Sequence, residues 1–143
     1  MGRIFLHLHG KPKQASYSDL IDMYGDRLKG RNIKIKIHPD KLSPIDYQDK
    51  LSQSNLVFFL DEKGAEFSSV ELSKMVSKWA LKSDDVHLAL GPVDGWPNKE
   101  QLNSKNTITL SKMTFPHELA AVLILEQLYR ATEIIKGTMY HRE

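Results

Sequence analysis

The chain of 143 residues contains no cysteine, which excludes disulfide bonds, thiolate catalysis and thiolate metal ligands together. It has no run approaching the roughly 18 to 20 consecutive apolar residues of a membrane span. Its first residues also lack the apolar region of a signal peptide. From these absences we expect a soluble, cytoplasmic protein that spans no membrane.

Neither sign of charge dominates the sequence. Twenty lysine and arginine residues oppose eighteen aspartate and glutamate residues, for a formal net charge of +2. This balance argues against a protein that binds nucleic acid through charge alone. Local clusters, Lys11 with Lys13 and Arg27 with Lys29 and Arg31, can still contact phosphates of a structured RNA recognised by its shape.

The pattern of apolar residues predicts alternating strands and helices. Period-two alternation and short apolar runs predict strands over residues 3–9, 32–38, 56–60, 86–90 and 107–110. Helical spacing predicts helices over residues 17–28, 47–52, 68–82 and 98–103, the third with Ser68 and Glu71 as a capping box. This order is typical of a parallel sheet with right-handed crossovers. We therefore expect one α/β domain over residues 1–143, with the sheet centre at 56–60.

The longest predicted helix runs from Pro116 to Lys136. Proline suits the first helical position, and Gly137 suits the residue just past the end. Its apolar residues cover more of the circumference than one contact with a sheet requires. This pattern predicts burial on two sides, of which a second subunit could supply one.

Three loops directly follow the strands expected to be buried. Each contains polar residues and either a glycine or a hydroxyl side chain. They are DEKGAEF at 61–67, GPVDGWP at 91–97 and SKMTFP at 111–116. In open parallel sheets ligands bind outside the carboxyl ends of the strands. We expect these loops to form one pocket.

The sequence shows no motif for phosphate binding or nucleophilic catalysis. GxGxxG, GxxxxGK[ST] and GxSxG are all absent. His7 and His9 share one face of a strand without further metal ligands at a recognisable spacing, so we expect no metal. His87 lies within a buried strand, where a hydrogen-bonded core role is expected. Asp61 and Glu62 are possible bases, or simply begin an exposed loop. The remaining possibility is that a reactive cofactor carries the chemistry and the protein positions it.

Several segments, taken in order, resemble one family of small methyltransferases. They are LDEKGAEFSS, GPVDG, LSKMTFPHELA, EQLYRA and the terminal YHRE, and they are preceded by Gly10 with Lys11 and by the pattern Tyr24, Arg27, Leu28. The family belongs to the SPOUT superfamily and methylates ring nitrogen 3 of a pseudouridine in large-subunit (23S) ribosomal RNA. The resemblance implies an α/β knot, in which the C-terminal strand and helix form a trefoil that binds S-adenosylmethionine. It also implies a homodimer paired through the knotted regions, with the large ribosomal subunit or its RNA as partner.

The resemblance also implies roles for particular residues. The cofactor contacts it implies are Leu60, Gly91, Leu110, Ser111, Lys112, Met113, Thr114 and Phe115. The catalytic tail it implies consists of Tyr140, His141, Arg142 and Glu143 and reaches the target base across the dimer. There Arg142 would stabilise the developing anion, and His141 or Glu143 would accept the proton.

One position departs from the family pattern, and two other functions stay open. The family has two adjacent glycines where this chain has Gly91 followed by Pro92, which lacks an N–H and has a fixed φ. The first alternative is an RNA-binding protein of the same fold with weak or no methyltransferase activity. The second is a SPOUT methyltransferase with another RNA target. Failure to bind the cofactor would identify the first, and methylation of other RNA the second.

Overall fold

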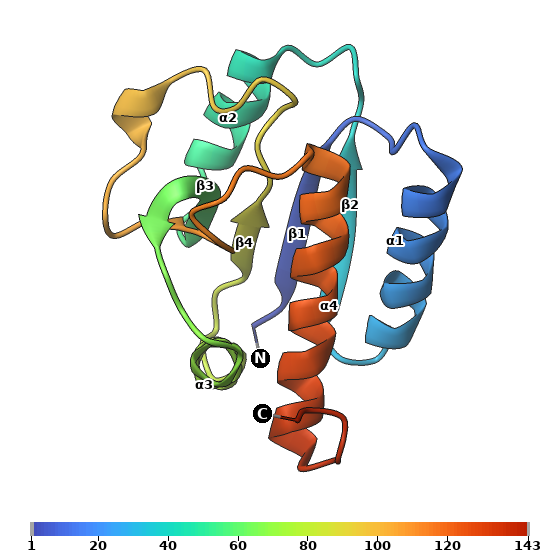
Figure 1. The fold of residues 1–143 in the computed structure, drawn as a ribbon. Coiled ribbons are helices and arrows are strands. Elements are labelled where there is room, and N and C mark those ends of the chain that lie inside the picture. The colour runs from blue at the N-terminus through green and yellow to red at the C-terminus, as the bar shows by residue number, and fades with distance from the viewer. Residues whose placement is uncertain (1, 143) are drawn as a thin grey trace.

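The computed structural model describes residues 2–142 and shows a five-stranded parallel sheet with helices on both faces (Figure 1). The strands are β1 (Ile4–His9), β2 (Ile33–His38), β3 (Val57–Ala65), β4 (Val86–Ala89) and β5 (Thr107–Ile108). The helices are α1 (Ala15–Leu28), α2 (Pro44–Ser52), α3 (Ser69–Ala80), the 3₁₀-helix η1 (Lys99–Gln101) and α4 (His117–Lys136). Each strand and helix expected from the sequence is therefore present, and the predicted parallel α/β architecture is confirmed.

The order of strands across the sheet is β2-β1-β4-β3-β5, with every neighbouring pair parallel. The expectation that residues 56–60 form the sheet centre is wrong, because β4 occupies that place. The side chains of Val86 and Leu88 in β4 are completely buried, whereas Val57 and Phe58 of β3 are only half-buried. The neighbour of β3 on its outer side is the two-residue strand β5, which covers little of it.

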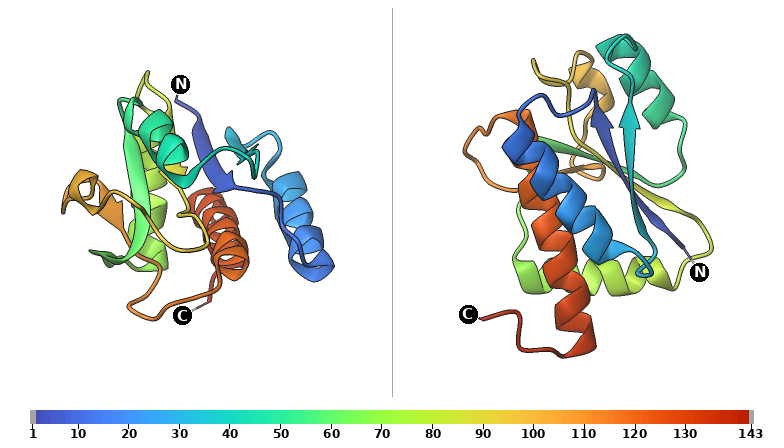
Figure 2. Two further views of the ribbon diagram at one scale, coloured as in Figure 1. Left: turned by 90° about the horizontal axis from the view of Figure 1, so that it is seen from above. Right: turned by 90° about the vertical axis from the view of Figure 1, so that its right-hand side faces the viewer.

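Helices α1, α3 and α4 cover one face of the sheet, and α2 with η1 lies on the other (Figure 2). The larger core joins Leu6 of β1 to Ile21 of α1, Leu72 of α3 and Leu125 of α4. A smaller core on the opposite face is built from Tyr47, Leu51, Phe59, Ala89 and Trp96. The two cores meet at β3 and β4, whose carboxyl ends lead into the loops predicted to bind a ligand.

Helix α4 ends at Lys136 as the sequence predicts, but it begins one residue later than predicted, at His117. Pro116 is its N-cap residue, and Gly137 ends it in the left-handed region with φ of 76°. Leu125 and Leu128 are fully buried, because the helix lies on the sheet between α1 and α3 (Figure 1). Burial on two sides is thus confirmed, and helices of the same chain provide it without a second subunit.

The end of β3 curls closely around β5. Both Leu60 and Ala65 of β3 are paired with Ile108, so residues 61–64 leave the regular register between these two contacts. A Cβ atom at Gly64 would lie 2.5 Å from the carbonyl carbon of Ile108. This position therefore requires glycine, because any side chain would collide with the backbone of β5.

The capping box that the sequence predicts fixes the chain after this curl. The Ser68 hydroxyl accepts the Glu71 N–H at 3.1 Å, and the Glu71 carboxylate accepts the Ser68 N–H at 2.8 Å. Helix α3 thus begins at a defined point, Ser69, eight residues beyond Asp61. Within residues 2–142, none of the helices combines the length and the apolar character needed to span a lipid bilayer.

Candidate functional site

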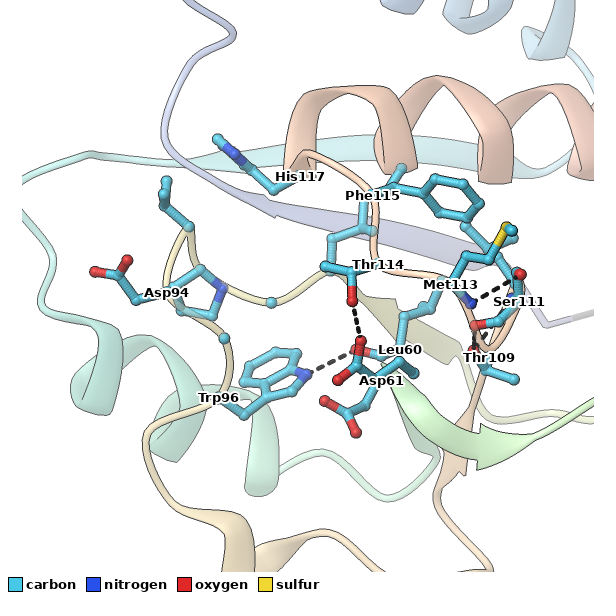
Figure 3. A pocket seen from close by; sticks show the side chains of 18 of the residues that line it. Leu60, Asp61, Asp94, Trp96, Thr109, Ser111, Met113, Thr114, Phe115 and His117 are labelled. Atoms are coloured by element: carbon cyan, nitrogen blue, oxygen red, sulfur yellow. Dashed lines mark hydrogen bonds between the residues drawn. The ribbon is translucent and has the colours of Figure 1, made fainter.

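A cavity of about 400 Å³ opens at the carboxyl ends of β4 and β5, beside Leu60, Asp61 and Glu62 in the middle of β3 (Figure 3). Small-molecule sites commonly have volumes of roughly 300 to 1,000 Å³, so this cavity can hold a ligand of cofactor size. The lining residues come from the three predicted loops and their neighbours: Leu60, Asp61, Glu62, Leu90, Gly91, Pro92, Val93, Asp94, Gly95, Trp96, Lys99, Thr109, Leu110, Ser111, Met113, Thr114, Phe115, His117 and Ala120. The structure thus brings the three loops together at one edge of the sheet.

The second half of β3 forms one wall, because the strand continues to Ala65 where the sequence predicts a loop beginning at Asp61. Contacts to η1 and to the loop after β5 hold this wall in place. The Asp61 carboxylate lies 3.6 Å from the ammonium group of Lys99. The Thr114 hydroxyl donates a short hydrogen bond to the Glu62 carboxylate (Figure 3). These contacts connect β3, η1 and the loop after β5 into a rim around the cavity.

The loop after β4 forms the second wall and contains a tight turn. The N–H of Gly95, at a φ of 84°, donates to the Pro92 carbonyl oxygen at 2.9 Å. Pro92 therefore begins this turn, a position that its fixed φ tolerates and that needs only its carbonyl group. Just before the turn, the Tyr47 hydroxyl donates to the Leu90 carbonyl oxygen at 2.7 Å. Burial raises the pKa of Tyr47, which keeps this hydroxyl protonated as a donor.

The loop after β5 is compact because its own side chains hold it. The Thr109 hydroxyl donates to the Ser111 carbonyl oxygen at 2.6 Å, and the Ser111 hydroxyl accepts the Met113 N–H at 3.0 Å. Lys112 does not line the cavity. Its side chain is 82% exposed, and its ammonium group pairs with Glu66 at 3.2 Å outside the cavity.

Charge and polarity in the cavity favour a cationic ligand with apolar parts. Asp61, Glu62 and Asp94 provide three carboxylates against the single ammonium group of Lys99. Apolar walls come from leucine, valine, methionine and phenylalanine side chains of the same lining. A concave site lined by excess negative charge attracts cations and concentrates them near the walls.

Most of the predicted cofactor contacts share this cavity. Leu60, Gly91, Leu110, Ser111, Met113, Thr114 and Phe115 all line it, and Lys112 is the exception. Sequence reasoning did not single out Asp94, Trp96 or Lys99. The sequence places these residues within or just after the loop at 91–97, but it does not indicate which of their side chains point into the cavity.

The predicted catalytic tail lies elsewhere on the chain. The Tyr140 hydroxyl donates to the Glu126 carboxylate at 2.8 Å, and the Arg130 guanidinium donates to Nδ1 of His141 at 3.2 Å. Burial and the hydrogen bond to Glu126 raise the pKa of Tyr140 to about 12. Arg142 is exposed, and Glu143 falls outside the described residues.

Helix α4 separates the tail from the cavity of its own chain. His117 and Ala120 in the first turn of α4 line the cavity. The tail follows the last turn, at the other end of this helix (Figure 1). A helix of 20 residues is roughly 30 Å long. The structure of one chain therefore does not bring Tyr140, His141 and Arg142 to the residues that line the cavity.

Three histidines form a chain of hydrogen bonds on the face of the sheet that α2 covers. Nδ1 of His7 lies 2.8 Å from Nε2 of His38, and Nε2 of His7 lies 2.8 Å from Nδ1 of His87. Burial is the main cause that lowers the pKa of His7 to about 3 and that of His38 to about 4. The imidazoles are therefore neutral near pH 7, and the hydrogen-bonded role predicted for His87 is confirmed. Residues 2–142 contain no group of three or more histidine or acidic side chains arranged to hold a metal ion.

An open parallel sheet with a cavity of this kind at its carboxyl edge defines an α/β protein that binds a small molecule between strand-end loops. The chain belongs to the SPOUT methyltransferase family, because the family model described as "Predicted SPOUT methyltransferase" matches residues 3–141. This result confirms the resemblance inferred from the sequence, and with it the fold class, a parallel-sheet α/β knot.

Relatives with assigned names extend over nearly the whole chain. Three of them carry the name "Ribosomal RNA large subunit methyltransferase H". The protein from Maridesulfovibrio salexigens is 38% identical and covers 92% of this chain and 93% of its own. Those from Anaeromyxobacter sp. and Prochlorococcus marinus are 33% and 31% identical, covering 93% and 98% of this chain and 95% and 96% of their own.

A solved structure shares the fold at much lower sequence identity. The crystal structure of TrmJ from Z. mobilis matches with a TM-score of 0.52 at 8% identity and covers 100% of this chain and 72% of its own. At this identity the similarity concerns the fold alone.

Proposed function

We propose that this chain is an S-adenosylmethionine-dependent methyltransferase of large-subunit ribosomal RNA. The observation that carries the proposal is the cavity formed by the three loops, in a chain that the SPOUT methyltransferase model matches over residues 3–141. Relatives named as methyltransferases of this RNA cover more than 90% of the chain at 31 to 38% identity. We propose that residues 1–143 act as one domain in the cytoplasm.

The residues that line the cavity fit S-adenosylmethionine. Its adenosine needs apolar walls and backbone hydrogen bonds, which Leu60, Leu110 and Phe115 can offer at the ends of their loops. Its sulfonium is cationic, and the carboxylates of Asp61 and Glu62 give the cavity the opposite charge. When bound, the cofactor would supply a methyl group already activated for transfer.

The protein's own part in the reaction is to hold the acceptor in line and to manage one proton. Alignment of this kind can provide roughly 7 to 11 kcal/mol of a barrier in favourable cases. We propose nitrogen 3 of a pseudouridine as the acceptor, on the strength of the family resemblance. That nitrogen is an imide N–H and must lose its proton during methylation.

The tail residues are the proposed groups for this proton transfer. Arg142 would stabilise the developing anion, and His141 or Glu143 would accept the proton directly or through water. Tyr140 suits a different task. With its pKa raised to about 12 it stays protonated near pH 7, so it would donate a hydrogen bond or position its neighbours.

We further propose that two chains form a homodimer and that the tail of each acts in the cavity of the other. The proposal is supported by the distance along α4 between the tail and the cavity of its own chain. Met139 and Ile135 near the tail are 81% and 49% exposed, which leaves apolar surface for a partner.

Complementation between two inactive variants tests this arrangement. One variant lacks residues 140–143, and the other carries Gly91→Trp, which adds a bulky side chain to the lining of the cavity. If the tail acts across the dimer, co-expression restores about one quarter of wild-type activity, because half of the dimers are mixed and each holds one complete site. If instead the tail acts in the cavity of its own chain, co-expression restores no activity, because every chain then has an incomplete site. Sedimentation of each variant controls for loss of the dimer.

The activity itself is tested with purified protein, S-adenosylmethionine and large ribosomal subunits. We expect cofactor binding by calorimetry and one added methyl group on a pseudouridine by mass spectrometry of the RNA. Absence of cofactor binding would favour the RNA-binding protein of the same fold. A methyl group at another nucleotide would favour a SPOUT methyltransferase with a different target.

A further inference from the structure

The side chain of Trp96 joins the cavity wall formed by β3 to the wall that follows β4. It is only 2% exposed, and its indole N–H donates to the Leu60 carbonyl oxygen at 2.8 Å (Figure 3). A Cβ atom at Gly91 would lie 3.2 Å from the indole nitrogen, so the ring also lies directly against the backbone of the second wall. One side chain therefore contacts both strand ends between which a ligand would bind.

Neighbouring rings hold Trp96 in this orientation. Its ring is stacked on Tyr47 with centroids 5.7 Å apart and planes 3° apart. On another side it meets the edge of Phe59, with centroids 4.9 Å apart and an interplanar angle of 82°. Because Tyr47 is also fixed through its hydrogen bond to Leu90, the indole has little freedom to turn.

The turn before Trp96 directs it beneath the cavity. Gly95 has a φ of 84°, which favours glycine, and its N–H closes the turn on Pro92. The next residue, Trp96, thereby returns toward the sheet while Val93 at the turn stays 70% exposed. The loop after β4 thus ends in a side chain, that of Trp96, which is bonded to β3 at Leu60.

From these contacts we infer that Trp96 is a positioning residue that fixes the separation of Leu60 and Gly91, and with it the width of the cofactor cleft. The indole N–H is the essential group, because it makes the one hydrogen bond from Trp96 to the opposite wall. The inference rests on the proposed function, since that proposal assigns the cleft to S-adenosylmethionine. Trp96 acts through Leu60 and Gly91 rather than on the reacting atoms.

Two replacements of Trp96 separate the hydrogen bond from the packing. Trp96→Phe removes the N–H together with part of the ring. Incorporation of 3-benzothienylalanine at position 96 keeps the two-ring shape and replaces only the N–H by sulfur. Trp79→Phe is the matched control, because Trp79 is also buried, at 6% exposure, but packs against Phe58 and does not line the cavity.

Calorimetry should show roughly tenfold weaker binding of S-adenosylmethionine for both Trp96 replacements, the effect expected for one buried hydrogen bond. The control should bind like the wild type. In methyl transfer, KM for the cofactor should rise by about the same factor, while kcat at saturating cofactor changes less than about threefold. Without cofactor, amide hydrogen exchange should accelerate at residues 61–64 and 91–95 in the Trp96 variants alone.

The possible failures differ in what they refute. If the wild type binds S-adenosylmethionine and both Trp96 variants bind it with the same affinity, the role of Trp96 is refuted and the proposed function is left intact. An equal loss of affinity in Trp79→Phe would also overturn it, because the effect would then reflect general destabilisation. A wild-type protein that binds no S-adenosylmethionine would refute the proposed function and, with it, the cofactor role of Trp96.

Discussion

Gly64→Ala is expected to destabilise the protein strongly, although it adds a single methyl group. The new Cβ would lie 2.5 Å from the carbonyl carbon and 2.6 Å from the nitrogen of Ile108. Ordinary contacts begin near 3.4 Å, so β3 and β5 would have to separate by about 0.9 Å at this point. Hydrogen bonds on both sides resist that movement, from Phe59 N–H to Asn106 at 2.7 Å and from Thr109 N–H to Ala65 at 3.0 Å.

The cost should lie at the upper end of the range for overpacking. Inserting a methylene group into a packed core costs roughly 1 to 3 kcal/mol when side chains can adjust, and here the obstacle is backbone. We therefore expect a loss of about 3 kcal/mol, which corresponds to a melting temperature lower by roughly 6 to 12 °C in a chain of this size. This loss is a large fraction of the free energy of unfolding, which is about 5 to 15 kcal/mol for a typical protein.

Urea unfolding of Gly64→Ala and of Gly25→Ala measures the effect with a matched control. At Gly25, in helix α1, the added Cβ meets only the flexible end of Ile35 at 3.1 Å. Alanine there should be neutral or stabilising by up to about 1 kcal/mol, owing to its higher helix propensity. A loss below about 1 kcal/mol in Gly64→Ala would refute the close approach of β3 to β5.

The remaining predictions concern pH, the loop after β4 and the tail. His7 and His38 have folded-state pKa values of about 3 and 4, below the unfolded value of 6.5, so stability is complete above pH 6.5 and falls as the pH decreases. Between pH 7 and pH 5 we expect a loss of up to about 2 kcal/mol per histidine in urea unfolding, and a flat profile would contradict it. Pro92→Gly should leave cofactor affinity unchanged or improve it, because the bond from Gly95 needs only the carbonyl group of residue 92; a large loss on calorimetry would show that the proline is required. Deletion of residues 140–143 should abolish methylation and preserve dimerisation and cofactor binding, so full activity in the truncated protein would remove the tail from the mechanism.

Local features were predictable from the sequence because short-range physics determines them. The limits of α4 follow from Pro116 and Gly137 to within one residue, and the start of α3 follows from the capping box of Ser68 and Glu71. The place of the site was predictable for a related reason, although residues 61–65 continue β3 and are not part of a loop. In a parallel sheet, knowing which segments are strands already places their carboxyl ends at one edge.

Long-range contacts were not predictable in the same way. The apolar run at 56–60 indicates burial, but it does not reveal which strands lie beside it, and the sheet centre was therefore misplaced. The hydrogen bond from Trp96 to Leu60 joins residues 36 positions apart and depends on the turn at Gly95. Lys112 lies within a correctly placed loop, yet its ion pair with Glu66 directs its side chain away from the cavity.

The chain of three imidazoles has a consequence for where its protons lie. Neutral His7 carries one N–H, so it donates either to His38 through Nδ1 or to His87 through Nε2 and accepts from the other. With both bonds intact, only two arrangements exist, and in each all the N–H groups point in the same direction across β2, β1 and β4. The tautomer of His38 at the edge of the sheet is thus tied to that of His87 at its centre. Nitrogen-15 shifts of the three rings would change together or not at all.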